Sequence, residues 1–290
     1  MKKQNHKKIA FQGFLGAYSD MACRAVYPSY ETVPCHSFEE AFNAVIHKKT
    51  DLAMIPVDNT LAGRVADVHH LIPKGGLYII GEHFEPIHHA LLGIKGAKKA
   101  DLKHVHSHVH AIPQCKNMIK RLKLKSHVHA DTAGAASEVA QRSDPAHAAI
   151  ASALAAKIYG LDILESNVED EDHNTTRFLV LSREHKVARY SASKPFMTSL
   201  VFRVRNIPAA LYKALGGFAT NGISMAKIES YVDPAFGVAQ FYAEVETHQD
   251  SPAFKQALEE LRFYAQSVTV LGTYETHPFR QKKKTARKRA

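Results

Sequence analysis

The sequence has few cysteines and no long apolar run, and both absences restrict what the protein can be. Cys23, Cys35 and Cys115 are the three cysteines in 290 residues, with no Cys-x-x-Cys pair, which suits reduced thiols better than a disulfide framework. No stretch approaches the ~20 apolar residues of a membrane helix. The first apolar run, Ile9–Phe11, stops at Gln12, so the amino terminus lacks the apolar core of a signal peptide. We therefore expect a cytosolic protein with no membrane partner.

Acidic residues are absent from both ends, and this accounts for the net charge of +10. Residues 1–8 hold four lysines, and residues 280–290 hold seven lysines and arginines. Removing these 11 from the 38 bases leaves 27 against 28 acids, a net charge of −1 for the remainder. Short basic ends are usually solvated. We therefore expect a basic tail at 276–290 and no specific nucleic-acid partner, because a dedicated binder carries its basic face on the folded body.

The first part of the chain alternates strand and helix patterns. Residues 9–12 predict a strand, followed by a glycine turn and a helix that Ser19 begins as its cap. Residues 37–49 predict a helix with a capping box at its start. The apolar run 52–56 predicts a buried strand that ends in the polar turn 57–60. This alternation is typical of a parallel α/β sheet.

A second α/β lobe follows. Its expected strands are 90–94, 104–107 and 148–151, and its expected helices are 111–123, 132–142 (capped by Asp131) and 152–159. The apolar strand Phe178–Leu181 is then expected to return to the first lobe. We assign lobe 1 to about 8–80 and 175–183 and lobe 2 to about 81–174, with a small-molecule cleft between them.

The pattern changes after the polar linker 183–195. Residues 196–275 predict the order β-α-β-β-α-β, a ferredoxin-like domain, with strands at 198–205, 223–232, 237–247 and 267–274 and helices at 208–220 and 251–264. The two helices cover one face of the sheet, and the other face or an edge is free to pair with another copy.

Histidine is abundant, at 19 residues, so metal binding has to be considered. His104, His106, His108 and His110 alternate, which places them on one face of a strand. No second cluster of Asp, Cys or Glu completes a ligand set, and no dinucleotide or nucleotide-phosphate motif occurs. We expect no metal and no cofactor.

Four motifs occur in the order seen in the prephenate dehydratase family, and residues 8–183 resemble that family. They are Gly13–Ser19, the run Pro56-Val57-Asp58-Asn59-Thr60, the pair Ser107-His108, and Thr176-Arg177-Phe178 preceded by Asn174. Residues 196–275 resemble the ACT regulatory domain that follows it in bacterial enzymes. The resemblance implies a two-lobed catalytic domain like periplasmic binding proteins. Asp58 stands where the family commonly has Glu and keeps the carboxylate. Thr60 stands where the family has Ser and keeps the hydroxyl.

The resemblance implies a hydro-lyase that converts prephenate to phenylpyruvate, CO2 and water in phenylalanine biosynthesis. Thr176, Arg177 and Asn59 are the implied catalytic residues. The Thr176 hydroxyl either donates a hydrogen bond to the leaving hydroxide or relays a proton to it from a neighbour. Arg177 either orients the pyruvyl carboxylate or pairs with Asp58. The implied substrate-binding residues are Ser19, Tyr18, Thr60, Asp58, Phe178, Asn174 and His108. Thr176 and Ser19 also have simpler roles as a strand residue and a helix cap.

The ACT resemblance implies that L-phenylalanine binds between paired domains of a homodimer or homotetramer. Its contacts would be Asn206, Ala209, Ala210, Leu211, Glu229 and Ser230. The family's Gly-Ala-Leu begins here with Ala209, whose methyl crowds an approach that glycine permits, and Tyr231-Val232 replaces Arg-Pro. Two other functions are consistent with the sequence: a dehydratase that prefers arogenate, and a non-catalytic two-lobed ligand sensor.

Overall fold

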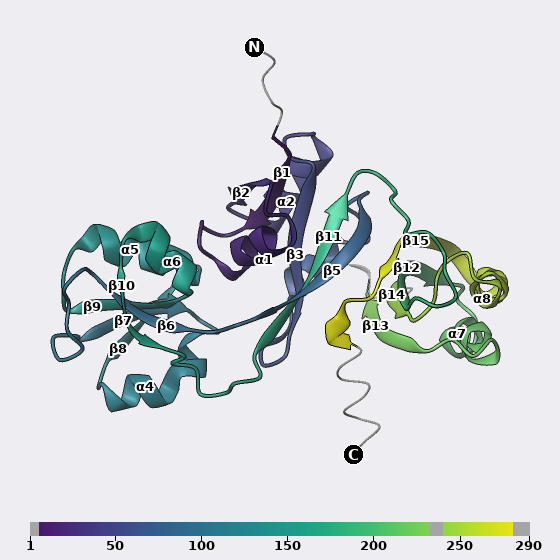
Figure 1. Cartoon of the computed structure of the whole chain (residues 1–290). Helices are drawn as coiled ribbons and strands as arrows, with labels where there is room; N and C mark the ends of the chain where they lie inside the picture. The colour runs from purple at the N-terminus through teal and green to yellow at the C-terminus, as the bar shows by residue number, and fades with distance from the viewer. Residues whose placement is uncertain (1–5, 233–239, 281–290) are drawn as a thin grey trace, which may run out of the picture. The chain divides into compact units, whose positions relative to one another are not determined.

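The computed structural model describes residues 6–232 and 240–280 (Figure 1). The chain forms two compact units: one combines the residues up to Val68 with His83–Phe178, and the other combines His69–Glu82 with the residues from Leu179 on. Residues 69–80, which we expected in the first lobe, and residues 81 and 82, which we expected in the second, therefore group with the C-terminal sheet. Within the described ranges, no helix has the length and apolar character needed to cross a bilayer.

The first sheet has the strand order β2-β1-β3-β11-β5, with β4 paired to β3. Strand β1 is parallel to both β2 and β3, as the sequence predicts. The strand predicted at 52–56 continues to Asn59, so the polar turn expected at 57–60 is wrong. Strand β11 returns beside β3, as expected. The strands are β1 (Lys8–Gln12), β2 (Glu31–Cys35), β3 (Leu52–Asn59), β4 (Gly63–Arg64), β5 (Tyr78–Pro86) and β11 (Thr175–Ser182).

Helices α1 (Tyr18–Val26), α2 (Phe38–Ile46) and α3 (Ala66–Leu71) accompany these strands. The expected cap at Ser19 is wrong: α1 begins one residue earlier, and Asp20 accepts a hydrogen bond from the Gly16 amide at 2.9 Å. The capping box at α2 is confirmed. Ser37 accepts from the Glu40 amide at 3.1 Å, and the Glu40 carboxylate accepts from the His36 amide at 2.7 Å.

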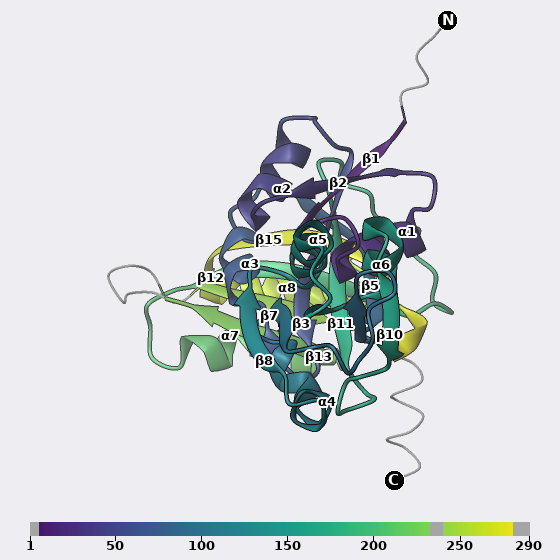
Figure 2. The ribbon, with the colours of Figure 1, turned by 90° about the vertical axis from the view of Figure 1, so that its left-hand side faces the viewer.

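The second lobe is a five-stranded sheet in the order β10-β6-β9-β7-β8. Helices α5 and α6 lie on one side of it and α4 on the other (Figures 1 and 2). The predicted helices and strands are all present, whereas β8 and β10 were not predicted. The elements are β6 (Ala90–Gly93), β7 (His104–His108), η1 (Ile112–Cys115), α4 (Lys116–Arg121), β8 (Lys125–His129), α5 (Thr132–Arg142), β9 (His147–Ala151), α6 (Ala153–Tyr159) and β10 (Asp162–Ser166).

The C-terminal residues form an antiparallel sheet in the order β13-β14-β12-β15. Its chain order β-α-β-β-α-β confirms the ferredoxin-like prediction. Leu200 and Phe202 pack with Phe218 and Phe254 of the two helices on one face. The elements are β12 (Phe196–Val204), α7 (Ala210–Thr220), β13 (Met225–Tyr231), β14 (Gln240–Val245), α8 (Pro252–Tyr264) and β15 (Ala265–Glu275).

The opposite face of this sheet is also buried, so our expectation of a free face is wrong. Met197 and Ser199, which point away from the helices, are both fully buried. Residues 69–82 cover this face, and Gly272 lies against the Ile79 backbone so closely that a side chain would collide with it. Both faces of the sheet are thus occupied within one chain.

Candidate functional site

Two neighbouring strands bring the motif residues together. Asn59 ends β3, and Thr176 is the second residue of the adjacent β11. Thr60 connects the two strands through three hydrogen bonds. Its amide donates to the Thr175 carbonyl at 3.0 Å. Its hydroxyl donates to the His173 carbonyl at 3.0 Å and accepts from the Thr175 amide at 2.9 Å. The Thr60 hydroxyl therefore acts on the backbone and fixes where β11 begins.

The side-chain amide of Asn59 has a defined orientation. Its Oδ1 accepts hydrogen bonds from the amides of Leu61 at 2.9 Å and Ala62 at 2.8 Å. Oδ1 must face these two donors, so Nδ2 faces the other way. Its two hydrogens are donated to Asn174 Oδ1 at 2.8 Å and Thr176 Oγ1 at 2.9 Å. All four hydrogen-bonding positions of this amide are filled.

This arrangement decides the role that the Thr176 hydroxyl can play. Because Asn59 donates to Oγ1, the hydroxyl is an acceptor in that bond and keeps its own proton for another partner. Among the residues that the structure describes, Asn59 is the hydrogen-bond partner of this side chain. Thr176 is half-buried. A small molecule beside it would meet a hydroxyl whose proton is available for donation.

A chain of polar contacts continues into the second lobe. Asn174, which is 2% exposed, donates from Nδ2 to Gln114 Oε1 at 2.9 Å. The same oxygen lies 3.0 Å from His89 Nε2, and His89 Nδ1 lies 2.7 Å from the Tyr18 hydroxyl. These contacts link the motif residues Tyr18, Asn174 and Asn59 through two residues that we had not assigned to the site, Gln114 and His89.

Burial keeps the two ionisable side chains of this network, His89 and Tyr18, in their neutral forms. Burial lowers the pKa of His89 and raises the pKa of Tyr18 well above its usual value, so both are neutral at pH 7. Gln114 Oε1 already accepts from Asn174 and accepts a second bond from His89 Nε2–H. The Tyr18 hydroxyl, which has one proton, then faces two acceptors, the His88 carbonyl at 2.8 Å and the unprotonated His89 Nδ1 at 2.7 Å. The network carries no charge and holds the amides in place.

Arg177 lies on the other face of β11 from Thr176. It is 6% exposed, its Nη1 is 3.5 Å from Asp58 Oδ2, and its guanidinium lies 6.0 Å from the centre of the Phe84 ring. These contacts favour pairing with Asp58 over contact with a carboxylate of the substrate. Phe178 is 1% exposed and belongs to the core.

A cavity of about 630 Å³ opens beside Asn59, within the usual size range of small-molecule sites. It carries one arginine, Arg64, and two acids, Glu39 and Asp67. Its lining residues, from both lobes, are Gln12, His36–Glu39, Pro56, Asn59, Ala62–Asp67, His108, His110 and Ala130. The expected cleft between the lobes is therefore present and contains two of the predicted residues, Asn59 and His108.

His108 is neutral in this cavity. Burial lowers its pKa, and the nearby His110 lowers it further, against an opposing effect of Asp131. Its Nδ1 accepts from the His110 amide at 3.3 Å. A neutral ring with Nδ1 occupied carries its proton on Nε2, so His108 can donate a hydrogen bond but is not a charged acid.

The glycine-rich loop joins the two lobes. The Ser152 hydroxyl donates to the Gly16 carbonyl, and the Tyr159 hydroxyl donates to the Leu15 carbonyl at 2.9 Å. Gly16 has φ +87°, and a Cβ on it would lie 2.8 Å from Ala155 Cα. Glycine is therefore required by both conformation and space. Ser19 is 8% exposed and lies behind this loop on α1.

The residues expected to bind the effector lie near one end of the C-terminal sheet. Asn206 and Ala209 follow β12, and Ala210 and Leu211 open α7, while Glu229 and Ser230 lie on β13. Arg203 and Tyr231 are both opposite Gln240, so the two segments share one end of the sheet with β14 between them. Ala209 has φ +57°, a left-handed conformation that favours glycine.

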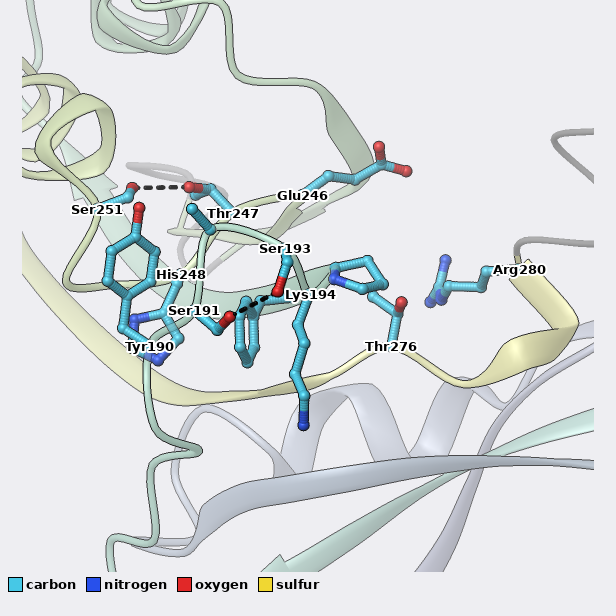
Figure 3. Close-up of a pocket in the computed structure, with 13 residues that line it drawn as sticks. Tyr190, Ser191, Ser193, Lys194, Glu246, Thr247, His248, Ser251, Thr276 and Arg280 are labelled. Carbon is cyan, nitrogen blue, oxygen red and sulfur yellow. Dashed lines mark hydrogen bonds between the residues drawn. The ribbon is translucent and has the colours of Figure 1, made fainter.

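A second cavity, of about 610 Å³, lies at the opposite end of the same sheet (Figure 3). The linker 190–196, the turn after β14, Ser251, Thr276 and Arg280 line it. Its polar groups bond to one another and to their surroundings: Ser191 with Ser193 at 2.9 Å, Thr247 with Ser251 at 2.8 Å, and Lys194 with Glu275 at 2.7 Å.

The alternating histidines divide into two groups. His104 and His106 join His127 and His147 in a histidine cluster whose rings are 4.5–5.1 Å apart, whereas His108 lies against His110. In the described part of the chain, no group of three or more His, Cys, Asp or Glu side chains is arranged to hold a metal ion.

Comparison with known proteins identifies the family. The prephenate dehydratase family model matches residues 9–186, more than half of the chain. The chain belongs to the prephenate dehydratase family. It is thus an enzyme, a hydro-lyase, as the motifs predicted.

Three relatives match nearly the whole chain. A Komagataeibacter europaeus protein described as a bifunctional N-acyl-homoserine lactone acylase/prephenate dehydratase is 48% identical, over 94% of this chain and 98% of its own. An Arabidopsis thaliana chloroplastic arogenate dehydratase/prephenate dehydratase is 39% identical, over 92% of this chain and 71% of its own. The crystal structure of an Arthrobacter aurescens prephenate dehydratase in complex with L-Phe has a TM-score of 0.84 at 26% identity and covers 92% of this chain and 89% of its own.

Proposed function

We propose that this member of the prephenate dehydratase family converts prephenate to phenylpyruvate, CO2 and water, with the Thr176 hydroxyl as the donor to the leaving hydroxide. The orientation of Asn59 is the observation that carries the proposal. Two backbone amides fix its Oδ1, and its Nδ2 donates to Thr176 Oγ1. Such preorganisation aims the threonine proton away from Asn59, where a substrate hydroxyl can accept it.

Loss of CO2 and water aromatises the ring of prephenate, so the substrate itself supplies the driving force. The enzyme has to stabilise the departing hydroxide and hold the ring in place. A threonine hydroxyl is too weak an acid to give up its proton outright, so it acts by a hydrogen bond that strengthens as negative charge develops. The proton that turns the departing hydroxide into water then comes from solvent.

The two carboxylates of prephenate need different surroundings. A tight cation clamp on the ring carboxylate would oppose its loss as neutral CO2, and the amides near Asn59 are neutral. Arg64, the arginine of the cavity, suits the pyruvyl carboxylate, which keeps its charge throughout. Arg177 acts from behind the strand by holding Asp58.

For regulation, we infer that L-phenylalanine binds near Asn206–Leu211 and Glu229–Ser230 and that the enzyme is a homo-oligomer paired through these domains. The ferredoxin-like fold supports this, as does the Arthrobacter aurescens relative, which is described as a complex with L-Phe. Ala209 adopts the left-handed conformation, which glycine takes more readily than alanine.

Arogenate is the competing substrate, because it has the same reacting ring and an ammonium group in place of the keto group. Glu39 and Asp67 line the cavity and can bind an ammonium group, and the Arabidopsis thaliana relative carries both activities in its name. Turnover of the two substrates at matched concentrations tests this. A kcat/KM at least ten-fold higher on prephenate supports the proposal, and the reverse order replaces prephenate with arogenate.

One relative also suggests a second activity. The Komagataeibacter europaeus protein is described as an N-acyl-homoserine lactone acylase as well as a dehydratase, and the match spans nearly both chains. We infer from this similarity that the chain also hydrolyses the amide bond of N-acyl-homoserine lactones. Release of homoserine lactone from an acylated substrate, followed by mass spectrometry, tests it, and a rate equal to that of buffer dismisses it.

A further inference from the structure

Residues 69–82 are anchored on the C-terminal sheet, and the chain on either side of them belongs to the unit that holds Asn59 and Thr176. We propose that this segment is the link through which the C-terminal sheet controls the catalytic cavity, with Tyr231 as the residue that engages it. The inference rests on the proposed effector site, because Tyr231 directly follows Glu229 and Ser230 in the sequence.

The first anchor is His69. It is 2% exposed, its Nδ1 lies 3.4 Å from the Tyr231 hydroxyl, and its ring meets the edge of Tyr242 at 6.4 Å between centres. The neighbouring His70 ring lies 5.9 Å from that of Tyr231. Tyr231 therefore touches both histidines at the end of α3. A shift of β13 at this residue displaces the end of that helix.

The second anchor is Glu82. Its side chain is fully buried and accepts two hydrogen bonds from Arg280, at 2.8 and 2.9 Å, and one from the His277 amide at 3.0 Å. A bidentate bond to a buried carboxylate is among the stronger polar contacts in proteins. Between the anchors, Ile79 lies directly against Gly272. The segment is thus held at both ends and in the middle.

Each anchor is two residues away from a residue of the unit that holds Asn59 and Thr176. Asp67, two residues before His69 on the same short helix, lines the cavity with Asn59. Phe84, two residues after Glu82 on β5, faces the guanidinium of Arg177. Two residues of helix or strand span only about 3–7 Å. A displacement of His69 therefore also moves Asp67 in the cavity wall, and a displacement of Glu82 also moves Phe84 beside Arg177.

The Tyr231 hydroxyl is the group that engages the first anchor. A ligand against Glu229 and Ser230 changes the position of the next residue on the strand, and the Tyr231–His69 contact passes this change to α3. The coupling is then a property of this hydroxyl rather than of the fold alone.

The test compares Tyr231→Phe with Tyr212→Phe, a change of the same group at an exposed position on α7 (82% exposed). Amide hydrogen exchange of the full chain reports on residues 63–71, and calorimetry with phenylalanine reports on effector binding. We expect Tyr231→Phe to speed exchange in 63–71 by about three-fold or more and to weaken the effect of phenylalanine on kcat/KM by a similar factor, while Tyr212→Phe changes neither.

Exchange that changes in 225–231 but stays at the wild-type rate in 63–71 would overturn the link. If wild type binds no phenylalanine, the effector proposal fails on its own, and the exchange experiment still decides whether Tyr231 acts on α3. Arg280→Gln provides a second variant at the other anchor. It should speed exchange in β5 around Phe84 if the link is real, and should leave β5 unchanged if Glu82 is only locally packed.

Discussion

Changing Asn59 to aspartate should slow turnover strongly by reversing the hydrogen bond between this residue and Thr176. The new carboxylate keeps an oxygen for the amides of Leu61 and Ala62, which lie 2.9 and 2.8 Å from Oδ1 in the wild type. Its second oxygen replaces Nδ2 and becomes an acceptor facing Thr176 Oγ1, which lies 2.9 Å from Nδ2 in the wild type. The threonine then donates its proton to this carboxylate and no longer to the substrate. The change removes both N–H donors of Asn59 and redirects the O–H of Thr176.

The size of the loss follows from what the donor does. Removing one oriented donor to a developing oxyanion typically costs about 10²–10³ in kcat, or roughly 2.7–4 kcal/mol. We therefore expect kcat on prephenate to fall by about that factor, with a smaller change in KM. Stability should fall as well, by about 1–3 kcal/mol, because the new carboxylate faces the Asn174 Oδ1 that Asn59 Nδ2 contacts at 2.8 Å in the wild type.

Asn174→Asp is the matched control. It adds the same charge next to Asn59 but leaves the bond from Asn59 Nδ2 to Thr176 Oγ1 in place. Initial rates of phenylpyruvate formation, read as the enolate in alkali, give kcat for both variants, and urea unfolding checks that both are folded. A folded Asn59→Asp variant with wild-type kcat would refute the role given to Asn59.

Three further predictions concern stability and reactivity. The unfolding free energy should fall by roughly 1–3 kcal/mol as the pH drops from about 6.5 to 4. Burial and the neighbouring rings lower the pKa of His106 to about 4, whereas an unfolded histidine takes up its proton near 6.5. In urea titrations at several pH values, a His106→Gln variant should lose much of this pH dependence. Gly16→Ala should destabilise the protein by about 1–3 kcal/mol, since it places a side chain at φ +87° against Ala155, and an unchanged urea midpoint would contradict this. The three buried cysteines should resist a thiol reagent at pH 8 until urea unfolds the chain. Burial raises the pKa of each thiol, that of Cys35 to about 11. Rapid labelling of the folded protein would contradict this prediction.

Much of the fold follows from local sequence patterns. The helix starting after Ser37 was predictable because a capping box is a local signal, and the C-terminal domain because its strands and helices alternate clearly. The short edge strands β8 and β10 were missed because their exposed residues give no apolar pattern. The role of residues 69–82 was also missed, since packing on a sheet that lies more than a hundred residues later leaves no local trace.

The candidate site was predictable only in part. The motifs placed Asn59, Asn174 and Thr176 in one site, and the structure brings the three within hydrogen-bond distance. Gln114 and His89 join them through contacts between residues distant in the sequence. For Gln114 the signal was its position shortly after the Ser107-His108 motif. His89 gave none, because a histidine before an apolar strand is as often a packing residue.

Turnover of prephenate by wild type, Thr176→Ser and Thr176→Val tests the central claim most directly. Serine keeps the hydroxyl that Asn59 orients, and valine keeps the shape without it. We predict that serine retains turnover within about ten-fold of wild type and that valine loses about 10²–10³ in kcat while remaining folded. A folded valine variant that turns over prephenate at the wild-type rate would contradict the assignment of Thr176 as the donor.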